Sequence, residues 1–267
     1  MARSIHGGAH ELGQNYLHHT ATLDLLVRQI QATEGPILEI GPGRGALTTR
    51  LAGLGRTLRA VDIDEHNVSV LRKKFPCVTI EHADILDAAL TEPVVVGNLP
   101  FHLTTPILRK LLTSSCWQHA IILVQWEVAR KRAGVGGATM LTAQSAPWYE
   151  FTLVGRVPAQ HFRPVPTVDG GVLHIHRRAK PLVPEPQRRD YQRFVKSVFT
   201  ARGRGLRQIL TRGLGYAGPA VGTSLQQAGL AATALPRDIN AHQWARLFAG
   251  LASGGKNRKT GPSGRRR

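Results

Sequence analysis

The 267-residue sequence is poor in cysteine and in acidic residues, and it has no long apolar run. Its two cysteines, Cys77 and Cys116, exclude a disulfide-rich secreted scaffold, and we expect both to be buried free thiols. No stretch approaches the ~20 consecutive apolar residues of a membrane span, and the amino terminus lacks an apolar signal-peptide core. These absences predict a cytoplasmic protein without a membrane anchor.

Acidic residues are scarcest in the last third of the chain. The whole sequence has 35 Lys and Arg against 17 Asp and Glu, a formal net charge of +18. From Arg177 onward there are 19 basic and 3 acidic residues, whereas residues 1–176 hold 16 and 14. A near-neutral part followed by a basic part predicts chemistry in the first and attraction to a phosphate backbone in the second.

A proline-rich connector at residues 180–186 predicts a domain boundary. We therefore expect a catalytic domain over residues 1–179, a basic helical domain over 180–252 and a disordered basic tail over 253–267. Apolar residues recur at helical spacing in the second domain, and their aromatic side chains are expected to form its core. Arg202, Arg204 and Arg207 are the better candidates to contact nucleic acid.

Strand-like and helix-like segments alternate through the first domain. Strands are predicted near residues 37, 58, 78, 94, 120, 152 and 172, and helices near 22, 46, 65, 105 and 138. This alternation predicts an α/β fold with a doubly wound sheet. In such sheets ligands bind outside the carboxyl ends of the strands.

A strand, a glycine loop and a helix follow one another between residues 37 and 48. Gly41, Gly43 and Gly45 have the spacing G-x-G-x-G, which permits close approach of a ligand to the backbone. Glu39 lies just before the loop, where a carboxylate disfavours a pyrophosphate but suits the sulfonium and ammonium of S-adenosylmethionine. The loop therefore favours a methyl donor.

Two further acids follow the next two predicted strands. Asp62 is placed to bond both hydroxyls of a cofactor ribose, and Asp84 to accept from an adenine amine while Ile85 packs on the ring. Each acid alone can be a helix cap, as we expect of Asp64. Three acids in order at successive strand ends favour a cofactor site.

The segment formed by Asn98, Leu99, Pro100 and Phe101 follows a β-branched apolar run that predicts a buried strand. Pro100 biases Leu99 toward extended geometry, so the Asn98 side chain and the Leu99 carbonyl can both accept from an exocyclic amine. Phe101 can stack on the ring that carries the amine. Alone, the segment can be a simple turn, but beside a methyl-donor site it predicts chemistry on a nucleobase amine.

With these motifs in order, the chain resembles the Erm rRNA adenine-N6 methyltransferases, relatives of the small-subunit rRNA dimethyladenosine transferases. The segment Gln14-Asn15-Tyr16-Leu17 is similar to the family's Q-N-F-L, and residues 161–169 are similar to its F-x-P-x-P-x-V block, which contains Phe162. Two residues depart from the family's pattern: Asp62 stands where Glu is common, and Phe101 where Tyr is common. Asp62 can still accept two hydrogen bonds, and Phe101 keeps an aromatic face for stacking. The resemblance implies a Rossmann-like class I methyltransferase fold and S-adenosylmethionine as cofactor.

The resemblance also implies roles for individual residues. Cofactor contacts are expected from Gln14, Asn15, Leu17, Glu39, Gly41, Gly43, Gly45, Asp62, Ile63, Asp84, Ile85 and Asn98. Catalytic roles are expected for Asn98, Leu99, Pro100, Phe101, Phe162 and Tyr16, with Phe101 and Phe162 sandwiching the target base and Tyr16 shielding the methyl group. No metal is expected.

The implied reaction is methylation of N6 of an adenine in 23S rRNA, before the ribosome is fully assembled, by a monomeric enzyme. In this family that reaction gives resistance to macrolide, lincosamide and streptogramin B antibiotics. Three alternatives stay open: a small-subunit rRNA adenine dimethyltransferase, a DNA adenine methyltransferase, and a nucleic-acid-binding factor that no longer catalyses.

Overall fold

The computed structural model describes residues 15–253, so the predictions for Gln14 and for the tail beyond Ser253 lie outside the described residues. The described chain forms two compact units. The first unit comprises residues 15–133 and 151–177, and the second comprises residues 134–150 and 178–253. No helix among residues 15–253 is long and apolar enough to cross a membrane.

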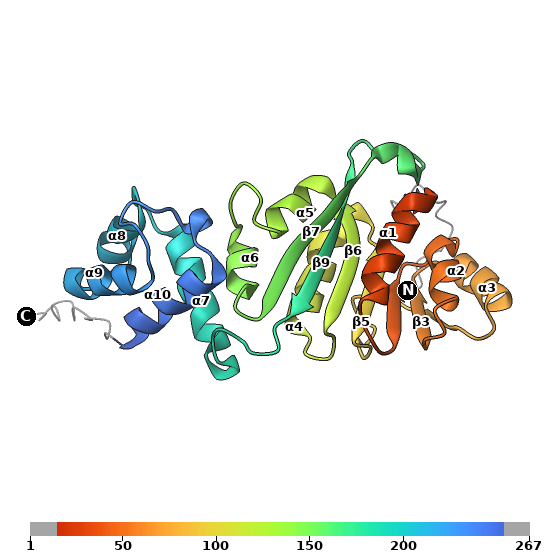
Figure 1. The fold of residues 1–267 in the computed structure, drawn as a ribbon, viewed down its shortest axis with the longest axis horizontal. Coiled ribbons are helices and arrows are strands. Elements are labelled where there is room, and N and C mark those ends of the chain that lie inside the picture. The colour runs from red at the N-terminus through yellow and green to blue at the C-terminus, as the bar shows by residue number, and fades with distance from the viewer. Residues whose placement is uncertain (1–14, 254–267) are drawn as a thin grey trace, which may run out of the picture. The chain divides into compact units, whose positions relative to one another are not determined.

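A seven-stranded sheet organises the first unit, and all seven predicted strands are present (Figure 1). They are β2 (Ile37–Ile40), β3 (Leu58–Asp62), β4 (Thr79–His82), β5 (Val94–Asn98), β6 (His119–Gln125), β7 (Tyr149–Val157) and β9 (Gly170–Arg177), in the order β4-β3-β2-β5-β6-β9-β7. Strands β4, β3, β2, β5 and β6 are parallel, and β9 is antiparallel to β6. The central strands are buried apolar runs, as expected of a sheet covered on both faces.

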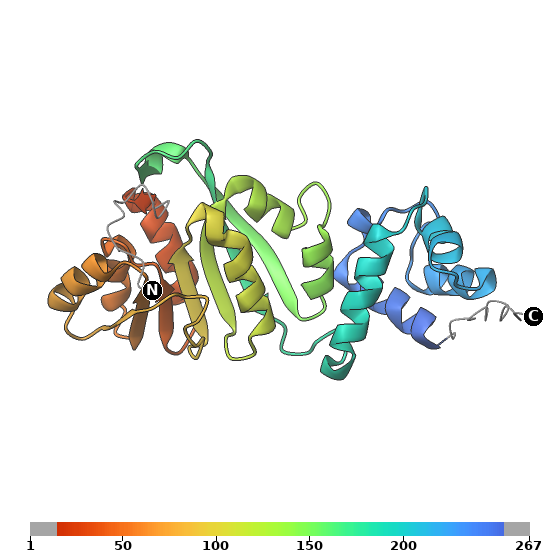
Figure 2. The same ribbon diagram turned by 180° about the vertical axis from the view of Figure 1, so that it is seen from behind.

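Helices lie on both faces of this sheet, which confirms the doubly wound prediction. They are α1 (Thr20–Gln31), α2 (Ala46–Ala52), α3 (Glu65–Lys74), α4 (Thr104–Thr113), which follows the short helix η1 (Phe101–Leu103), and α5 (Trp126–Arg132). Helix α1 lies on the face turned toward the viewer in Figure 1, and α4 lies on the face seen in Figure 2. Asp64 caps α3 as predicted, because its side chain accepts from the amides of His66 and Asn67.

A second, two-stranded sheet was not predicted from the sequence. Strand β1 (Tyr16–Leu17) pairs antiparallel with β8 (Phe162–Arg163), which follows the short helix η2 (Ala159–His161). The amide of His18 adds a hydrogen bond to the His161 carbonyl at 3.1 Å. This pairing joins the amino-terminal motif to the F-x-P block, although they are far apart in the sequence.

The second unit is helical and has an aromatic core, as predicted. Its elements are α6 (Met140–Ser145), η3 (Glu185–Gln187), α7 (Arg188–Thr200), α8 (Leu206–Gln208), the π-helix η4 (Ile209–Gly213), α9 (Gly218–Gln227), η5 (Pro236–Asp238) and α10 (Ala241–Ser253). Phe194 contacts Trp244 and Phe248, with ring centroids 6.1 and 5.7 Å apart, and Tyr191 contacts Phe248 edge-on. All four rings are buried.

The second unit includes residues 134–150, which precede the proline-rich connector. The hydroxyl of Tyr191 donates to the Ala143 carbonyl at 2.8 Å, and Arg178 donates to the Ala146 carbonyl at 3.0 Å. These contacts join residues that are far apart in the sequence. A domain boundary predicted from the connector alone therefore leaves residues 134–150 out of the second unit. A second expectation was wrong: Cys77 and Cys116 are free thiols, but both are exposed.

Candidate active site

A cavity of about 490 Å³ opens at the carboxyl ends of the parallel strands. Twelve residues singled out from the sequence line it: Asn15, Tyr16, Leu17, Glu39, Gly41, Gly43, Asp62, Ile63, Asp84, Ile85, Asn98 and Pro100. Four others, Gly45, Leu99, Phe101 and Phe162, are not in its lining. The parallel arrangement brings motifs from four strands to one edge of the sheet.

The glycine loop that follows β2 is shaped by Gly43. Its φ of +54° is in the left-handed region, and a Cβ atom there would lie 2.8 Å from Cε1 of Tyr16. The loop therefore needs glycine both for its turn and for the close approach of Tyr16. Arg44 packs over the ring of Tyr16, with its guanidinium carbon 4.8 Å from the ring centroid.

Asp62, at the end of β3, holds the glycine loop by a hydrogen bond. Its Oδ2 accepts from the amide of Gly43 at 3.0 Å, and its Oδ1 accepts from the amide of Asp64 at 2.9 Å. Burial raises the pKa of this carboxyl above its usual value, although the two amides oppose the shift. Each oxygen keeps a further lone pair, so Asp62 can still accept from two hydroxyls.

Glu39 is the most deeply buried acid of the cavity, with 2% of its surface exposed. Its Oε2 atom has no hydrogen-bond partner among residues 15–253. Burial raises the pKa of Glu39 from 4.5 to about 8, so the side chain is mostly protonated at neutral pH. A buried carboxyl with one oxygen unpartnered is suited to a cationic ligand.

Asp84 and Ile85 lie in the loop after β4. The Oδ1 atom of Asp84 accepts from the amide of Leu86 at 2.8 Å, which sets the orientation of the carboxylate. Ile85 is buried against the cavity, whereas Ile63 on the same lining is half exposed. The loop thus presents a carboxylate beside an apolar surface, the pair of features that an amino-purine can use.

Asn98 ends β5 with a fixed amide orientation. Its Nδ2 donates to the carbonyl of Asn15 at 2.6 Å, and because only the nitrogen of an amide can donate, the Oδ1 atom is left as the acceptor. The amide of Leu99 donates to the Leu123 carbonyl at 3.0 Å, which holds the following turn. Gly97 allows this close packing, because a Cβ atom there would lie 2.5 Å from the carbonyl oxygen of Ile40.

Comparison with known protein families identifies the family to which this chain belongs. The family model described as "Ribosomal RNA adenine dimethylase" matches residues 5–252.

This chain belongs to the ribosomal RNA adenine dimethylase family.

Relatives within this family are similar over most of their length. The chain is 49% identical to an "rRNA adenine N-6-methyltransferase" of Corynebacterium diphtheriae, over 77% of this chain and 83% of that protein. It is 46% identical to the "Mycinamicin-resistance protein MyrB" of Micromonospora griseorubida, over 91% and 78%. Among solved structures, "23S rRNA methyltransferase ErmE" superposes with a TM-score of 0.81 at 31% identity, covering 89% of this chain and 100% of that one. The fold is therefore the class I methyltransferase fold that was predicted.

In this family member, the two phenylalanines predicted to sandwich a base are packed against each other. Phe162 is fully buried, and its ring meets that of Phe101 edge-on, with centroids 6.2 Å apart at an interplanar angle of 73°. Rings that stack on the two sides of a base would have roughly parallel faces, whereas these two rings are edge-to-face, the other arrangement that aromatic pairs favour. The sandwich stays a prediction, and Phe101, which is only partly buried, has the more accessible ring.

Several residues that line the cavity were not predicted from the sequence: His18, Arg44, His102 and Arg163. His102 directly follows Phe101, so extending the motif by one residue identifies it. Arg163 is opposite Tyr16 in the β1–β8 pair, a placement that no local pattern encodes. No group of His, Cys, Asp and Glu in the described part of the chain is arranged to hold a metal ion.

Proposed function

We propose that this protein transfers a methyl group from S-adenosylmethionine to N6 of an adenine in 23S rRNA, and so confers resistance to macrolide, lincosamide and streptogramin B antibiotics. The observation that carries the proposal is the Asn98 amide, which is held by Asn15 with Oδ1 as its free acceptor and lines the cavity that Glu39, Asp62 and Asp84 also line. The names of the two relatives and of the ErmE structure support the choice of substrate.

The residues of the cavity fit S-adenosylmethionine. The unpartnered Oε2 of Glu39 provides a buried acceptor for a cation, and ionisation of Glu39 beside a sulfonium or ammonium offsets the cost of its burial. Asp62 would accept from the ribose hydroxyls and Asp84 from the adenine amine, with Ile85 against the ring. When bound, the cofactor supplies a methyl group activated by a positive sulfur.

Asn98 and the Leu99 carbonyl would orient the acceptor amine. Hydrogen bonds from both amine hydrogens to these acceptors favour the tetrahedral, more nucleophilic nitrogen. Alignment of that nitrogen with the methyl group would then accelerate the transfer. Phe101 would stack on a base turned out of the RNA, supported from the side by Phe162. Tyr16, fixed by Gly43 and Arg44, would close the methionine end of the cavity.

The second unit would supply affinity for the RNA backbone. Arg202, Arg204 and Arg207 are exposed, and no acidic side chain of residues 15–253 forms an ion pair with them. The segment that carries them is fixed: the amide of Leu206 donates to Ala234 and that of Arg207 to Ala232. Exposed guanidinium groups on a segment with a fixed backbone are suited to phosphates. A 23S rRNA substrate would place the enzyme in the cytoplasm.

Methyl transfer to separated RNAs tests the proposal. The protein is incubated with methyl-labelled S-adenosylmethionine and with 23S rRNA, 16S rRNA or duplex DNA. We expect incorporation into 23S rRNA, at a rate about 100-fold lower with an Asn98→Ala variant. Incorporation only into 16S rRNA or only into duplex DNA would replace the proposal with one of the other methyltransferases. Binding to RNA without any incorporation would indicate a binding factor.

A further inference from the structure

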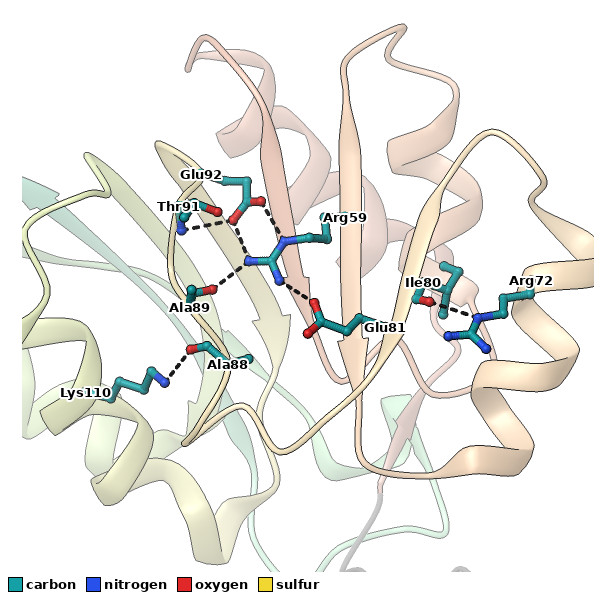
Figure 3. Close-up of polar contacts among 9 residues, drawn as sticks. All are labelled: Arg59, Arg72, Ile80, Glu81, Ala88, Ala89, Thr91, Glu92 and Lys110. Atoms are coloured by element: carbon teal, nitrogen blue, oxygen red, sulfur yellow. Dashed lines mark hydrogen bonds and ion pairs between the residues drawn. The ribbon is translucent and has the colours of Figure 1, made fainter.

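The loop between β4 and β5, residues 83–93, carries Asp84 and Ile85 but contains no helix or strand. Its first turn is closed by the amides of Asp87 and Ala88, which both donate to the Asp84 carbonyl at 2.9 Å. A loop of this length that positions a carboxylate needs further support from the elements around it. Two cationic side chains provide that support, and Figure 3 shows them on the two sides of the loop.

Lys110, on α4, holds the loop from one side. Its Nζ atom donates to the carbonyl of Leu86 at 2.8 Å. It also donates to the carbonyl of Ala88, as Figure 3 shows. The amide of the same Leu86 donates to Oδ1 of Asp84. The carbonyl of Leu86 therefore accepts from Lys110, and its amide donates to the Asp84 carboxylate. Through Leu86, Lys110 would orient that carboxylate.

Arg59, on β3, holds the other end of the loop. It donates to the Ala89 carbonyl at 2.6 Å, to both oxygens of Glu92 at 2.7 and 2.9 Å, and to Glu81 at 2.7 Å (Figure 3). The hydrogen bond with Glu92 raises the pKa of Arg59, despite its partial burial. Because Arg59 also joins β3 to β4 through Glu81, its loss would affect the sheet, whereas both hydrogen bonds of the Lys110 ammonium go to carbonyls of the loop.

We propose that Lys110 is a positioning residue that sets the selectivity of the cofactor site for adenine, by holding Leu86 so that the Asp84 carboxylate faces the purine amine. The inference rests on the proposed function, because it assumes that the adenosine part of S-adenosylmethionine lies against Asp84 and Ile85. Lys110 also lies on α4, which begins just after η1, so it connects the cofactor loop to a helix that follows the Asn98–Phe101 segment closely.

Binding of two product analogues to the full-length protein tests the role of Lys110. S-adenosylhomocysteine has a 6-amine, whereas S-inosylhomocysteine has at that position an oxygen, which accepts and cannot donate to Asp84. Calorimetry measures both dissociation constants for wild type, Lys110→Met, Lys110→Arg and the control Lys73→Met, which replaces an exposed lysine on α3. Circular dichroism checks that each variant is folded.

For Lys110→Met we expect S-adenosylhomocysteine to bind about 10-fold more weakly, the size of one charged hydrogen bond, with little change for S-inosylhomocysteine. Lys110→Arg should recover most of the preference, Lys73→Met should match wild type, and kcat at saturating cofactor should change less than KM. Equal weakening of both analogues, or an unchanged preference in folded Lys110→Met, would overturn the inference. Failure of wild type to bind S-adenosylhomocysteine would instead contradict the proposed function.

Discussion

Replacing Glu39 with glutamine should change how the stability of the protein depends on pH. The pKa of Glu39 is about 8 in the folded chain and near 4.5 when the chain is unfolded. Between these values the folded state holds a proton that the unfolded state has released, so the free energy of unfolding falls as pH rises. At about 1.4 kcal/mol per pH unit, the interval sets an upper limit of about 5 kcal/mol.

Urea unfolding followed by circular dichroism at pH 5, 6, 7, 8 and 9 measures this effect. Glu39→Gln keeps the size of the side chain but cannot ionise, so its free energy of unfolding should rise relative to wild type by about 2–5 kcal/mol between pH 5 and pH 9. Glu127→Gln, an exposed glutamate on α5, is the matched control and should follow wild type. A constant difference between Glu39→Gln and wild type across this range would refute the assignment of a raised pKa to Glu39.

Three further predictions concern separate features. Gly97→Ala places a Cβ atom against the Ile40 carbonyl, so thermal unfolding should show a loss of about 1–3 kcal/mol, and an unchanged melting temperature would contradict the close contact. Burial and the neighbouring His176 and His174 lower the pKa of His119 to about 4, so its contribution to stability should be complete above pH 6.5 and decline as pH falls toward 4; His119→Gln should reduce that decline, and an identical acid profile would argue against it. Asn98→Ala should lower kcat about 100-fold because the acceptor amine loses its orientation, and single-turnover methylation at the wild-type rate would exclude this role.

Much of the site could be predicted from the sequence because it depends on local patterns. The glycine loop follows β2, Asp62 ends β3 and Asp84 follows β4, and parallel strands place their carboxyl ends at one edge of the sheet. Glu39, Asp62 and Asp84 consequently line one cavity together with Asn98. The strand positions were predictable for the same reason, since short β-branched runs bounded by turn residues are informative by themselves.

The remaining features depend on contacts between distant segments. The pairing of Tyr16 with Arg163 involves two strands of two residues each, too short to give a periodic signal. The edge-on packing of Phe162 on Phe101 and the assignment of residues 134–150 to the second unit also result from tertiary contacts. The unpartnered oxygen of Glu39 is known only once every neighbour is placed.

The most direct test of the account is to identify the modified atom. 23S rRNA is incubated with the protein and S-adenosylmethionine, digested to nucleosides and analysed by mass spectrometry, with the modified position mapped by primer extension. We predict N6-methyladenosine or N6,N6-dimethyladenosine at one position of 23S rRNA. A methyl group on any other atom, or on a base other than adenine, would contradict the role assigned to Asn98 and to the cavity it lines.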